Sequence, residues 1–239
     1  MNSAFAIELA SQGVSVRAAD FRQPDLMRRA LEGVEKALFI PTYDANDLRL
    51  QQNVNAIEAA QAAGVKRLIT QSISFICSPA AAGLDAAGLS TEDTPLYLDG
   101  GPAIAPLAQA VATLERLTLH TPGLQGMVLR YGWFYGPGTN YDPASGATVR
   151  AVRKGRSPLV TSAAGTGRGV YSYIDVADAA RATLLALHSS KAGLYNIVDN
   201  EPAAHGTWLP ELARLLHAPA PPHMDAAAAR AAMGDMLVH

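Results

Sequence analysis

The sequence predicts an α/β fold in which a parallel sheet carries helices on both faces, with a small C-terminal lobe. Helical and extended patterns alternate along the chain, which is typical of strands joined by helical crossovers. Residues 37–40 form a continuous apolar run, as expected for a strand covered on both faces. No linker or internal repeat divides the 239 residues, so we expect one domain. Its core comprises about residues 1–135 plus 171–200, and its lobe about 136–170 and 201–239.

The elements of the first half follow from apolar spacing and from the residues that begin and end helices. Gly64 is placed as the residue that ends the longest of these helices. The expected elements are a helix that ends near Gly13, a strand over 14–18, a helix from Pro24 to about Gly33, a strand over 37–40, a helix over about 44–63 and a strand over 65–73.

The second half begins with a segment, residues 78–105, that is rich in Ala, Gly, Pro and Asp and is expected to form a long loop. The tail from Pro219 is rich in Pro and then in Ala, and a helix is compatible with it. The other expected elements are a helix over 106–120, a strand over 126–134, a short helix over 147–154, a helix over 176–187 capped by Asp175, a strand over 194–199 and a helix over 207–216 capped by Thr207.

Composition excludes several classes of protein. With 49% hydrophobic residues, 17% charged residues and a formal net charge of -2, the chain has no basic surface of the kind that binds nucleic acid or an anionic membrane. The single cysteine, Cys77, cannot form an internal disulfide, and no apolar run is long enough for a membrane span. The six histidines show no metal-binding spacing. We therefore expect a cytoplasmic protein with no metal and with no nucleic-acid or membrane partner.

Three motifs and the order of the elements carry a resemblance to a known family. The motifs are LRYGWFYGPGT from Leu129, SYIDVADAA from Ser172 and LYNIVDNEPA from Leu194. Between Gly13 and Pro202 the chain resembles the extended and atypical short-chain dehydrogenase/reductases of the NAD-dependent epimerase/dehydratase type. The resemblance implies a Rossmann-like fold, a small organic or sugar-like substrate, and NAD or NADP as the cofactor.

Chains of that family begin with a strand, a GxxGxxG turn and a helix, which together hold the cofactor's pyrophosphate. The present sequence starts in a later helix, so we expect it to bind NAD(H) or NADP(H) only weakly. The two strands that separate residues 14–18 from residues 37–40 in the family's sheet are also missing from the sequence. We therefore expect these two segments to pair directly as parallel neighbours, which would avoid leaving two apolar strand edges exposed.

The family's reaction uses a Ser or Thr together with a Tyr and a Lys in YxxxK spacing, so that the ammonium lowers the pKa of the phenol. Alignment of the helix on Glu115 places Leu107 and Val111 at the Tyr and Lys positions, and neither can transfer a proton. An atypical branch of the family shares this pattern. We therefore expect the acid or base to come from a tyrosine beside an arginine. The candidate catalytic residues are Tyr135, Ser72, Tyr131 and Arg168.

The remaining candidate residues follow from the same motifs. Those expected to bind substrate are Ser74, Trp133, Tyr171 and Asn140, and those that only the resemblance assigns to the cofactor are Asp20 and Asn53. Three functions stay open at this point: an oxidoreductase- or epimerase-like enzyme, a cofactor-independent isomerase or cyclase that reuses the pocket, and a non-enzymatic protein that senses NAD(P) or another ligand. The expected partner is a small-molecule substrate, and assembly into a homodimer is open.

Overall fold

The computed structural model describes residues 4–42, 44, 46–74, 77, 89–100, 102, 104–162, 165–167 and 169–233. The chain divides into two compact units, and each is described by itself. Unit 1 comprises Met1–Gln71, Ala110–Val128 and Lys191–Gly193, and unit 2 comprises Ser72–Gln109, Leu129–Ser190 and Leu194–His239.

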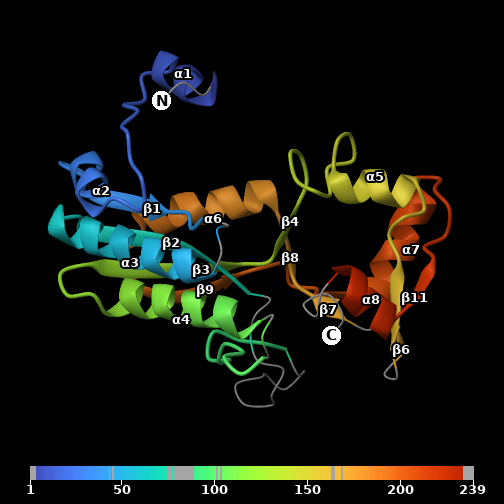
Figure 1. Ribbon diagram of the computed structural model, residues 1–239. Helices are drawn as coiled ribbons and strands as arrows, with labels where there is room; N and C mark the ends of the chain where they lie inside the picture. The colour runs from blue at the N-terminus through green and yellow to red at the C-terminus, as the bar shows by residue number, and fades with distance from the viewer. Residues whose placement is uncertain are drawn as a thin grey trace. The chain divides into compact units, whose positions relative to one another are not determined.

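The central sheet has four strands in the order β1-β2-β3-β9, and helices flank it, which confirms the predicted α/β class (Figure 1). These strands are β1 (Lys36–Phe39), β2 (Arg67–Ile73), β3 (Gln125–Tyr131) and β9 (Gly193–Ile197). β1 and β2 are parallel, with Lys36 opposite Arg67 and Phe39 opposite Thr70. The middle of β2 is fully buried, as expected for a strand covered on both faces.

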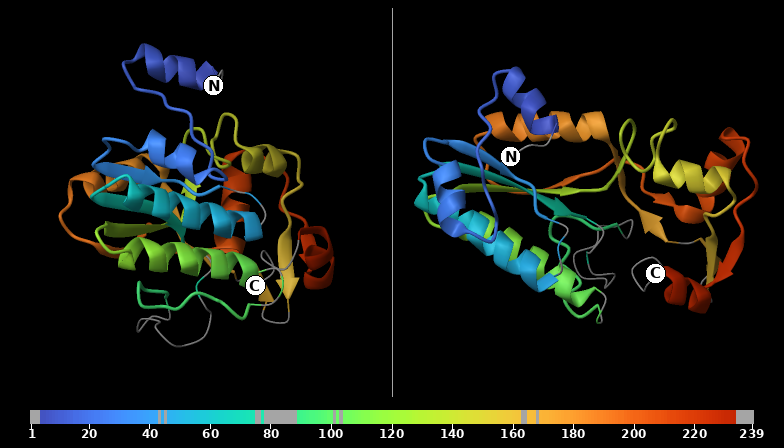
Figure 2. Two further views of the ribbon diagram at one scale, coloured as in Figure 1. Left: turned by 60° about the vertical axis from the view of Figure 1, so that its left-hand side comes forward. Right: turned by 45° about the horizontal axis from the view of Figure 1, so that its top comes forward.

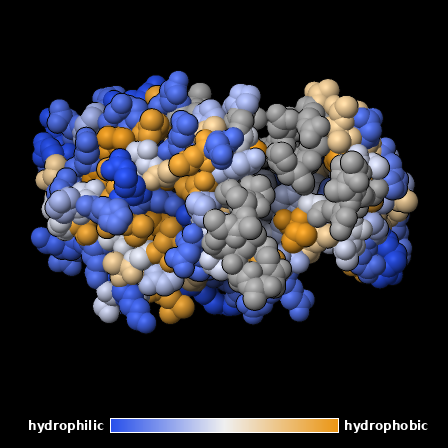
Figure 3. Space-filling model, turned by 90° about the horizontal axis from the view of Figure 1, so that it is seen from below, coloured by the Kyte–Doolittle hydropathy of each residue, from blue (hydrophilic) through white to orange (hydrophobic). Residues whose placement is uncertain are grey.

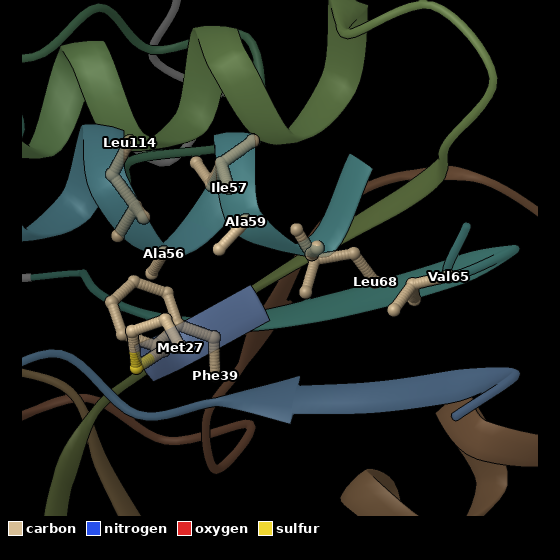
Figure 4. Packing of buried hydrophobic residues seen from close by; sticks show 9 residues of the cluster. Met27, Phe39, Ala56, Ile57, Ala59, Val65, Leu68 and Leu114 are labelled. Atoms are coloured by element: carbon tan, nitrogen blue, oxygen red, sulfur yellow. The ribbon is translucent and has the colours of Figure 1, made fainter. Parts of the chain in front are cut away.

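Helices pack an apolar cluster against the strands of unit 1 (Figure 4). These helices are α2 (Pro24–Ala30), α3 (Asn46–Ala62) and α4 (Ala105–His120), whereas α1 (Ala4–Ser11) contributes no residue to the cluster. The cluster consists of Met27, Phe39, Ala56, Ile57, Ala59, Ala60, Val65, Leu68 and Leu114. Small alanines on α3 allow this helix to lie close to the strands, so the aliphatic and aromatic side chains of its neighbours fill the space between them.

The predicted helix ends of unit 1 are confirmed at α2 and α3. Pro24 occupies the first turn of α2, where its missing N–H costs nothing. Gly64 ends α3 with a φ of 78°, which is unfavourable for residues that carry a Cβ. Its N–H donates to the carbonyl oxygen of Gln61 at 3.0 Å, so the helix carbonyl has a partner where the helix stops.

The predicted strand over residues 14–18 is wrong. This segment contains no strand, Val14 is 47% exposed, and β1 pairs only with β2 among the residues that the structure describes. The Arg17 guanidinium instead donates to the carbonyl oxygens of Ala30 at 2.9 Å and Glu32 at 2.7 Å, at the end of α2. The last carbonyls of a helix have no intrahelical partner, and Arg17 bonds to that of Ala30 and to that of Glu32 just beyond the helix. The expected pairing of 14–18 with 37–40 is therefore also wrong, and α1 lies away from the other helices of unit 1 (Figure 2).

The described part of unit 2 contains short paired strands and the helices α5 to α8. β4 is parallel to β8, β10 is antiparallel to β7, and β5 is parallel to β11 and antiparallel to β6. Helix α7 packs on α5 and β5 (Figure 1). The elements are β4 (Trp133–Tyr135), α5 (Ala147–Arg153), β5 (Leu159–Ser162), β6 (Gly165–Thr166), β7 (Val170–Tyr171), β8 (Tyr173–Asp175), α6 (Val176–His188), β10 (Ala203–Ala204), α7 (His205–Leu215), β11 (His223–Asp225) and α8 (Ala226–Met233).

The expected single strand over residues 126–134 divides at Gly132 into β3 and β4. The Gly132 N–H donates to the carbonyl oxygen of Ile197 at 3.1 Å, whereas the Trp133 N–H donates to that of Ser172 at 2.9 Å. A Cβ at position 132 would lie 2.7 Å from the Ser172 carbonyl oxygen. A glycine is therefore required at position 132, where the hydrogen-bond partner of the chain changes from Ile197 to Ser172.

Helix α6 begins as predicted, because an Asp175 carboxylate oxygen accepts from the Ala177 N–H at 2.8 Å. Helix α7 begins two residues before the expected cap Thr207, since β10 leads directly into it and makes Ala204 the N-cap. The alanine-rich tail is helical, and the strand β11 that precedes it pairs with β5.

Exposed hydrophobic side chains are scattered on the surface. On the face that Figure 3 draws, hydrophobic residues form several separate groups among hydrophilic ones. None of the helices in the described part of the chain is both long and apolar enough to span a membrane. No group of three or more His, Cys, Asp or Glu residues there is arranged to hold a metal ion.

Candidate functional site

Unit 2 contains a pocket of about 290 Å³, which is at the small end of the range for sites that bind organic molecules. It lies among β4, α5, β5, β7, β8 and α7, and the loop before α5. The lining residues are Trp133, Asn140, Tyr141, Thr148, Ser157, Pro158, Val160, Tyr171, Tyr173, His205, Trp208 and Leu209.

Three aromatic rings in this pocket contact one another edge to face. The centroids of Tyr141 and Tyr173 are 5.8 Å apart, and both rings lie 5.7 Å from that of Trp208. Their interplanar angles of 77° to 88° are those of favourable edge-to-face pairs. The His205 ring lies 5.0 Å from Trp208. We call Tyr141, Tyr173 and Trp208 the aromatic triad.

The triad is held largely by packing. The Trp208 indole N–H is buried and forms no hydrogen bond with suitable geometry. Burial raises the pKa of the Tyr173 phenol, and the nearby Trp208 N–H opposes this rise. Leu209, the next residue on α7, is fully buried beside Val152 of α5 and Leu159 of β5. The position of the indole therefore depends on α7 and on the two tyrosine rings.

A rigid turn positions Tyr141. The predicted glycine turn is present, with φ of 104° at Gly136 and 77° at Gly138. The Asp142 carboxylate accepts from the Gly138 N–H at 3.1 Å, from the Ala144 N–H at 2.8 Å and from the Ser145 hydroxyl at 2.8 Å. These bonds, the one from Gly138 first, lower the pKa of Asp142 to about 2. The turn next to the triad is thus held by an ionised carboxylate at neutral pH.

The described part of the pocket lining is electrically neutral. The described lining residues include no Asp, Glu, Lys or Arg. Burial raises the pKa of the phenols of Tyr141, Tyr171 and Tyr173, so they stay protonated at neutral pH. Burial also lowers the pKa of His205, which favours the neutral imidazole. The site therefore offers aromatic faces and neutral hydrogen-bonding groups to a ligand.

Among the residues expected to bind substrate, the pocket brings together Trp133, Asn140 and Tyr171. Ser74 does not line it, because both its N–H and its hydroxyl donate to the carbonyl oxygen of Tyr131 at 3.1 Å. Ser72 is 3% exposed within β2 and also lies outside the lining. Arg168 falls outside the described residues.

Tyr131 is 4% exposed, and its hydroxyl lies 2.6 Å from that of Thr183 on α6. Because the Thr183 hydroxyl donates to the Ala179 carbonyl oxygen at 2.8 Å, Tyr131 is the donor of the pair. Burial raises the pKa of Tyr131, although its bond to Thr183 opposes this. Its hydroxyl thus joins β3 to α6, and Tyr131 lies outside the pocket lining.

Tyr135 also lies outside the pocket lining and is 37% exposed. Partial burial raises the pKa of its phenol, and a hydrogen bond to Asp199 together with the charges of Asp175 and Asp178 raises it further. The pKa of Tyr135 thus shifts in the direction opposite to the lowering that a neighbouring arginine would cause, while the expected pairing with Arg168 stays a prediction because that residue lies outside the described ranges.

Leu107 and Val111, at the positions of the family's Tyr and Lys, are 9% and 5% exposed on α4. The adjacent backbone is contacted from α3, where the Asn53 amide donates to the Ala110 carbonyl oxygen at 3.4 Å. This face of α4 is thus part of an apolar interior and carries no proton-transfer group at either position.

The residues that the resemblance assigns to the cofactor are already engaged. Asp20 pairs with the Arg22 guanidinium at 2.8 Å, and hydrogen bonds from Arg22 lower the pKa of Asp20 to about 2. Asn53 is 1% exposed and supports α4. The 239 residues contain no GxxGxxG turn, whose backbone N–H groups would bind the pyrophosphate. The two candidate cofactor residues thus make their described bonds within this chain, and the family's glycine turn is not among the 239 residues.

Sequence reasoning named only three of the lining residues, and those that it missed include the aromatic triad and the imidazole beside it: Tyr141, Tyr173, Trp208 and His205. Signals existed for the two tyrosines, since Tyr141 follows the GPGT turn and Tyr173 lies within the SYIDVADAA motif. Nothing local distinguished His205 or Trp208, because they reach the pocket through the pairing of β10 with β7.

Comparisons with known proteins identify the family. A 3-diazoavenalumate denitrifying reductase of Streptomyces sp is 40% identical over 193 residues, which cover 80% of this chain and 60% of the relative. The chain thus spans about three fifths of that protein's length. Triphenylmethane reductase of Citrobacter sp., in complex with NADP(H), superimposes with a TM-score of 0.63 at 26% identity over 92% of this chain and 66% of the reductase. The nucleoside-diphosphate-sugar epimerase PA4631 of Pseudomonas aeruginosa has a TM-score of 0.71 at 22% identity over 94% of this chain and 70% of its own, which shows a shared fold. Residues 12–198 match the model of the NAD dependent epimerase/dehydratase family, and the chain belongs to that family.

Proposed function

We propose that this protein is a reductase-type member of the family, which binds a small organic substrate in the unit 2 pocket and uses no proton relay from α4. One observation carries the proposal: Leu107 and Val111 occupy the relay positions and are buried. A Tyr and a Lys at these positions serve reactions in which a substrate oxygen gains or loses a proton. Hydride addition to a cationic conjugated centre gives a neutral product, and addition to a neutral one gives an anion that is delocalised over the acceptor and takes its proton from water. Neither product requires a proton from a positioned side chain.

The names of two relatives support a reductase. One is a denitrifying reductase of a diazo compound and the other a triphenylmethane reductase bound to NADP(H). A reduced nicotinamide would supply the hydride in such a reaction. The residues present here do not form its pyrophosphate site, so what this chain contributes is the substrate pocket and its neutral, aromatic surroundings.

The test measures oxidation of NADH and NADPH by the purified protein, at saturating nucleotide, with a benzenediazonium salt, a quinone and a triphenylmethane dye as acceptors. We expect acceptor-dependent oxidation with at least one of them. Loss of this activity in Trp208→Leu, with retention in Leu184→Ala, would place the reaction at the pocket, because Leu184 is 59% exposed on α6. Absence of oxidation with all three acceptors contradicts the proposal. Turnover without nucleotide would favour a cofactor-independent isomerase instead, and binding without turnover a ligand sensor.

A further inference from the structure

We propose that the unit 2 pocket binds a flat, electron-poor aromatic group that carries no phosphate. This inference rests on the proposed function, because it names the class of substrate that the proposed reductase takes. It follows from three properties of the pocket: its electron-rich walls, the absence of charged side chains among its described lining residues, and the occupied N–H groups at the start of α7.

The walls come from residues whose ring faces are rich in π electrons. Indole and phenol rings carry negative charge on their faces and positive charge at their edges. The rings of the aromatic triad pack edge to face, and the pocket is lined by these rings together with Trp133 and Tyr171. A ring depleted of electrons by nitro, carbonyl or diazo substituents stacks on such faces more favourably than an electron-rich ring of the same size.

The described lining residues are not of the kind that binds a nucleoside diphosphate. Proteins bind phosphate groups through Arg or Lys side chains, or through free backbone N–H groups at the start of a helix. The described lining has neither side chain. At the start of α7, the His205 N–H donates to the Gly169 carbonyl oxygen at 2.9 Å, and the Gly206 N–H donates to that of Gly167 at 2.7 Å. These groups are therefore not available to an anion.

The titration of the neighbouring groups does not change this conclusion. Tyr141, Tyr171 and Tyr173 have raised pKa values and stay neutral, and His205 has a lowered pKa and is neutral at physiological pH. The carboxylate of Asp142, which follows Tyr141 in the sequence, accepts hydrogen bonds from groups of its own turn. The pocket thus selects by ring shape and electron density, and its small volume suits compounds of one or two rings.

The two tryptophans of the chain provide the measurement, because both line the pocket. Protein labelled with ¹⁵N gives one indole N–H signal for each, and Trp208→Phe assigns them. The signals are followed by two-dimensional NMR during titration with 1,3-dinitrobenzene, with the electron-rich 1,3-dimethoxybenzene of similar size, and with UDP-glucose. We expect saturable shifts of both signals with dinitrobenzene, a dissociation constant about 3- to 10-fold higher for dimethoxybenzene, and no saturable shift with UDP-glucose.

Variants locate the binding. Tyr141→Leu removes one ring of the triad and should abolish the preference for dinitrobenzene, and Trp208→Leu should do the same as read by calorimetry. Tyr97→Phe is the matched control, because Tyr97 is a half-buried tyrosine of unit 2 outside the pocket lining, and it should bind as the unmodified chain does. A variant that loses its dispersed NMR spectrum is set aside, and the other triad variant then decides.

Three outcomes would overturn the inference: equal or tighter binding of dimethoxybenzene, saturable shifts of both indoles with UDP-glucose, or no saturable shift with dinitrobenzene. These titrations contain no nucleotide, so they do not depend on hydride transfer. Binding of dinitrobenzene by a protein that reduces no acceptor would leave this inference intact and refute only the proposed reductase. Reduction of an acceptor with both indole signals unmoved would do the opposite.

Discussion

Removal of the Tyr131 hydroxyl distinguishes a structural from a catalytic tyrosine. In Tyr131→Phe the ring stays in place, but the hydroxyl that donates to Thr183 at 2.6 Å is lost. Thr183 keeps its own bond to the Ala179 carbonyl oxygen at 2.8 Å, so its hydroxyl is not left wholly unpaired. We expect a loss of about 1 to 1.5 kcal/mol in the free energy of unfolding, the net value of one buried hydrogen bond.

Removal of the Thr183 hydroxyl should lower the free energy of unfolding more than removal of the Tyr131 hydroxyl does. Thr183→Val removes the acceptor and leaves a phenol O–H without its partner on a residue that is 4% exposed. An unsatisfied buried donor costs about 1 to 3 kcal/mol. In the double variant both partners are absent, so its loss should be smaller than the sum of the two single losses by about 1 kcal/mol.

Urea unfolding followed by circular dichroism measures these differences, and 1,3-dinitrobenzene titration measures binding in the same variants. A structural role predicts lower stability with unchanged binding in Tyr131→Phe. Additive losses in the double variant would show that the pair does not interact. Unchanged stability combined with lost activity in Tyr131→Phe would refute the structural assignment and restore Tyr131 as a catalytic residue.

Three further predictions concern the relay positions, the cofactor and acid pH. The double variant Leu107→Tyr/Val111→Lys should lose several kcal/mol in the free energy of unfolding, because both positions are buried. It should gain no nicotinamide-dependent alcohol oxidation. Such oxidation would contradict the proposal that α4 supplies no proton relay. Calorimetry should show at most weak binding of NADPH to this chain, and a low-micromolar dissociation constant would refute this. The pKa of Asp142 is lowered from 3.8 to about 2, so the stability that its carboxylate contributes is present above about pH 4 and is lost as the pH falls towards 2. In Asp142→Asn the free energy of unfolding should therefore depend less on pH over that range. The same pH dependence in the variant and the unmodified chain would contradict this role of Asp142.

The elements that the sequence predicted correctly are those determined by local pattern. Helices α2 and α3 begin and end within two or three residues of the expected positions, because Pro24 and Gly64 act on the backbone next to them. The strand over 14–18 had the apolar alternation of a strand, but a strand also needs a neighbour to accept its backbone hydrogen bonds. In the structure Arg17 bonds to the end of α2 instead, which is a tertiary contact that no local pattern reveals.

The same limit applies to the site. The motif around Gly136 indicated a turn, and Trp133, Asn140 and Tyr171 were found because they lie near it or near the next motif. Sequence spacing does not tell which face of a strand a side chain takes. Tyr131 was therefore expected in the site although it faces α6, and Tyr141 was overlooked.

The direction of the pKa shifts favours chemistry that needs no acid from the pocket. A general acid works best when its pKa lies near the working pH, whereas burial raises the pKa of Tyr141, Tyr171 and Tyr173 away from it. Burial lowers the pKa of His205, which favours its uncharged imidazole at neutral pH, so His205 is also a weak proton donor. With apolar residues at both relay positions, the described groups stabilise a neutral aromatic ligand better than they protonate an oxyanion. A conjugated, electron-poor substrate that accepts hydride spreads the added electron pair over its ring and substituents, and solvent can then supply the proton, so such a substrate requires binding by the aromatic pocket and no acid from it.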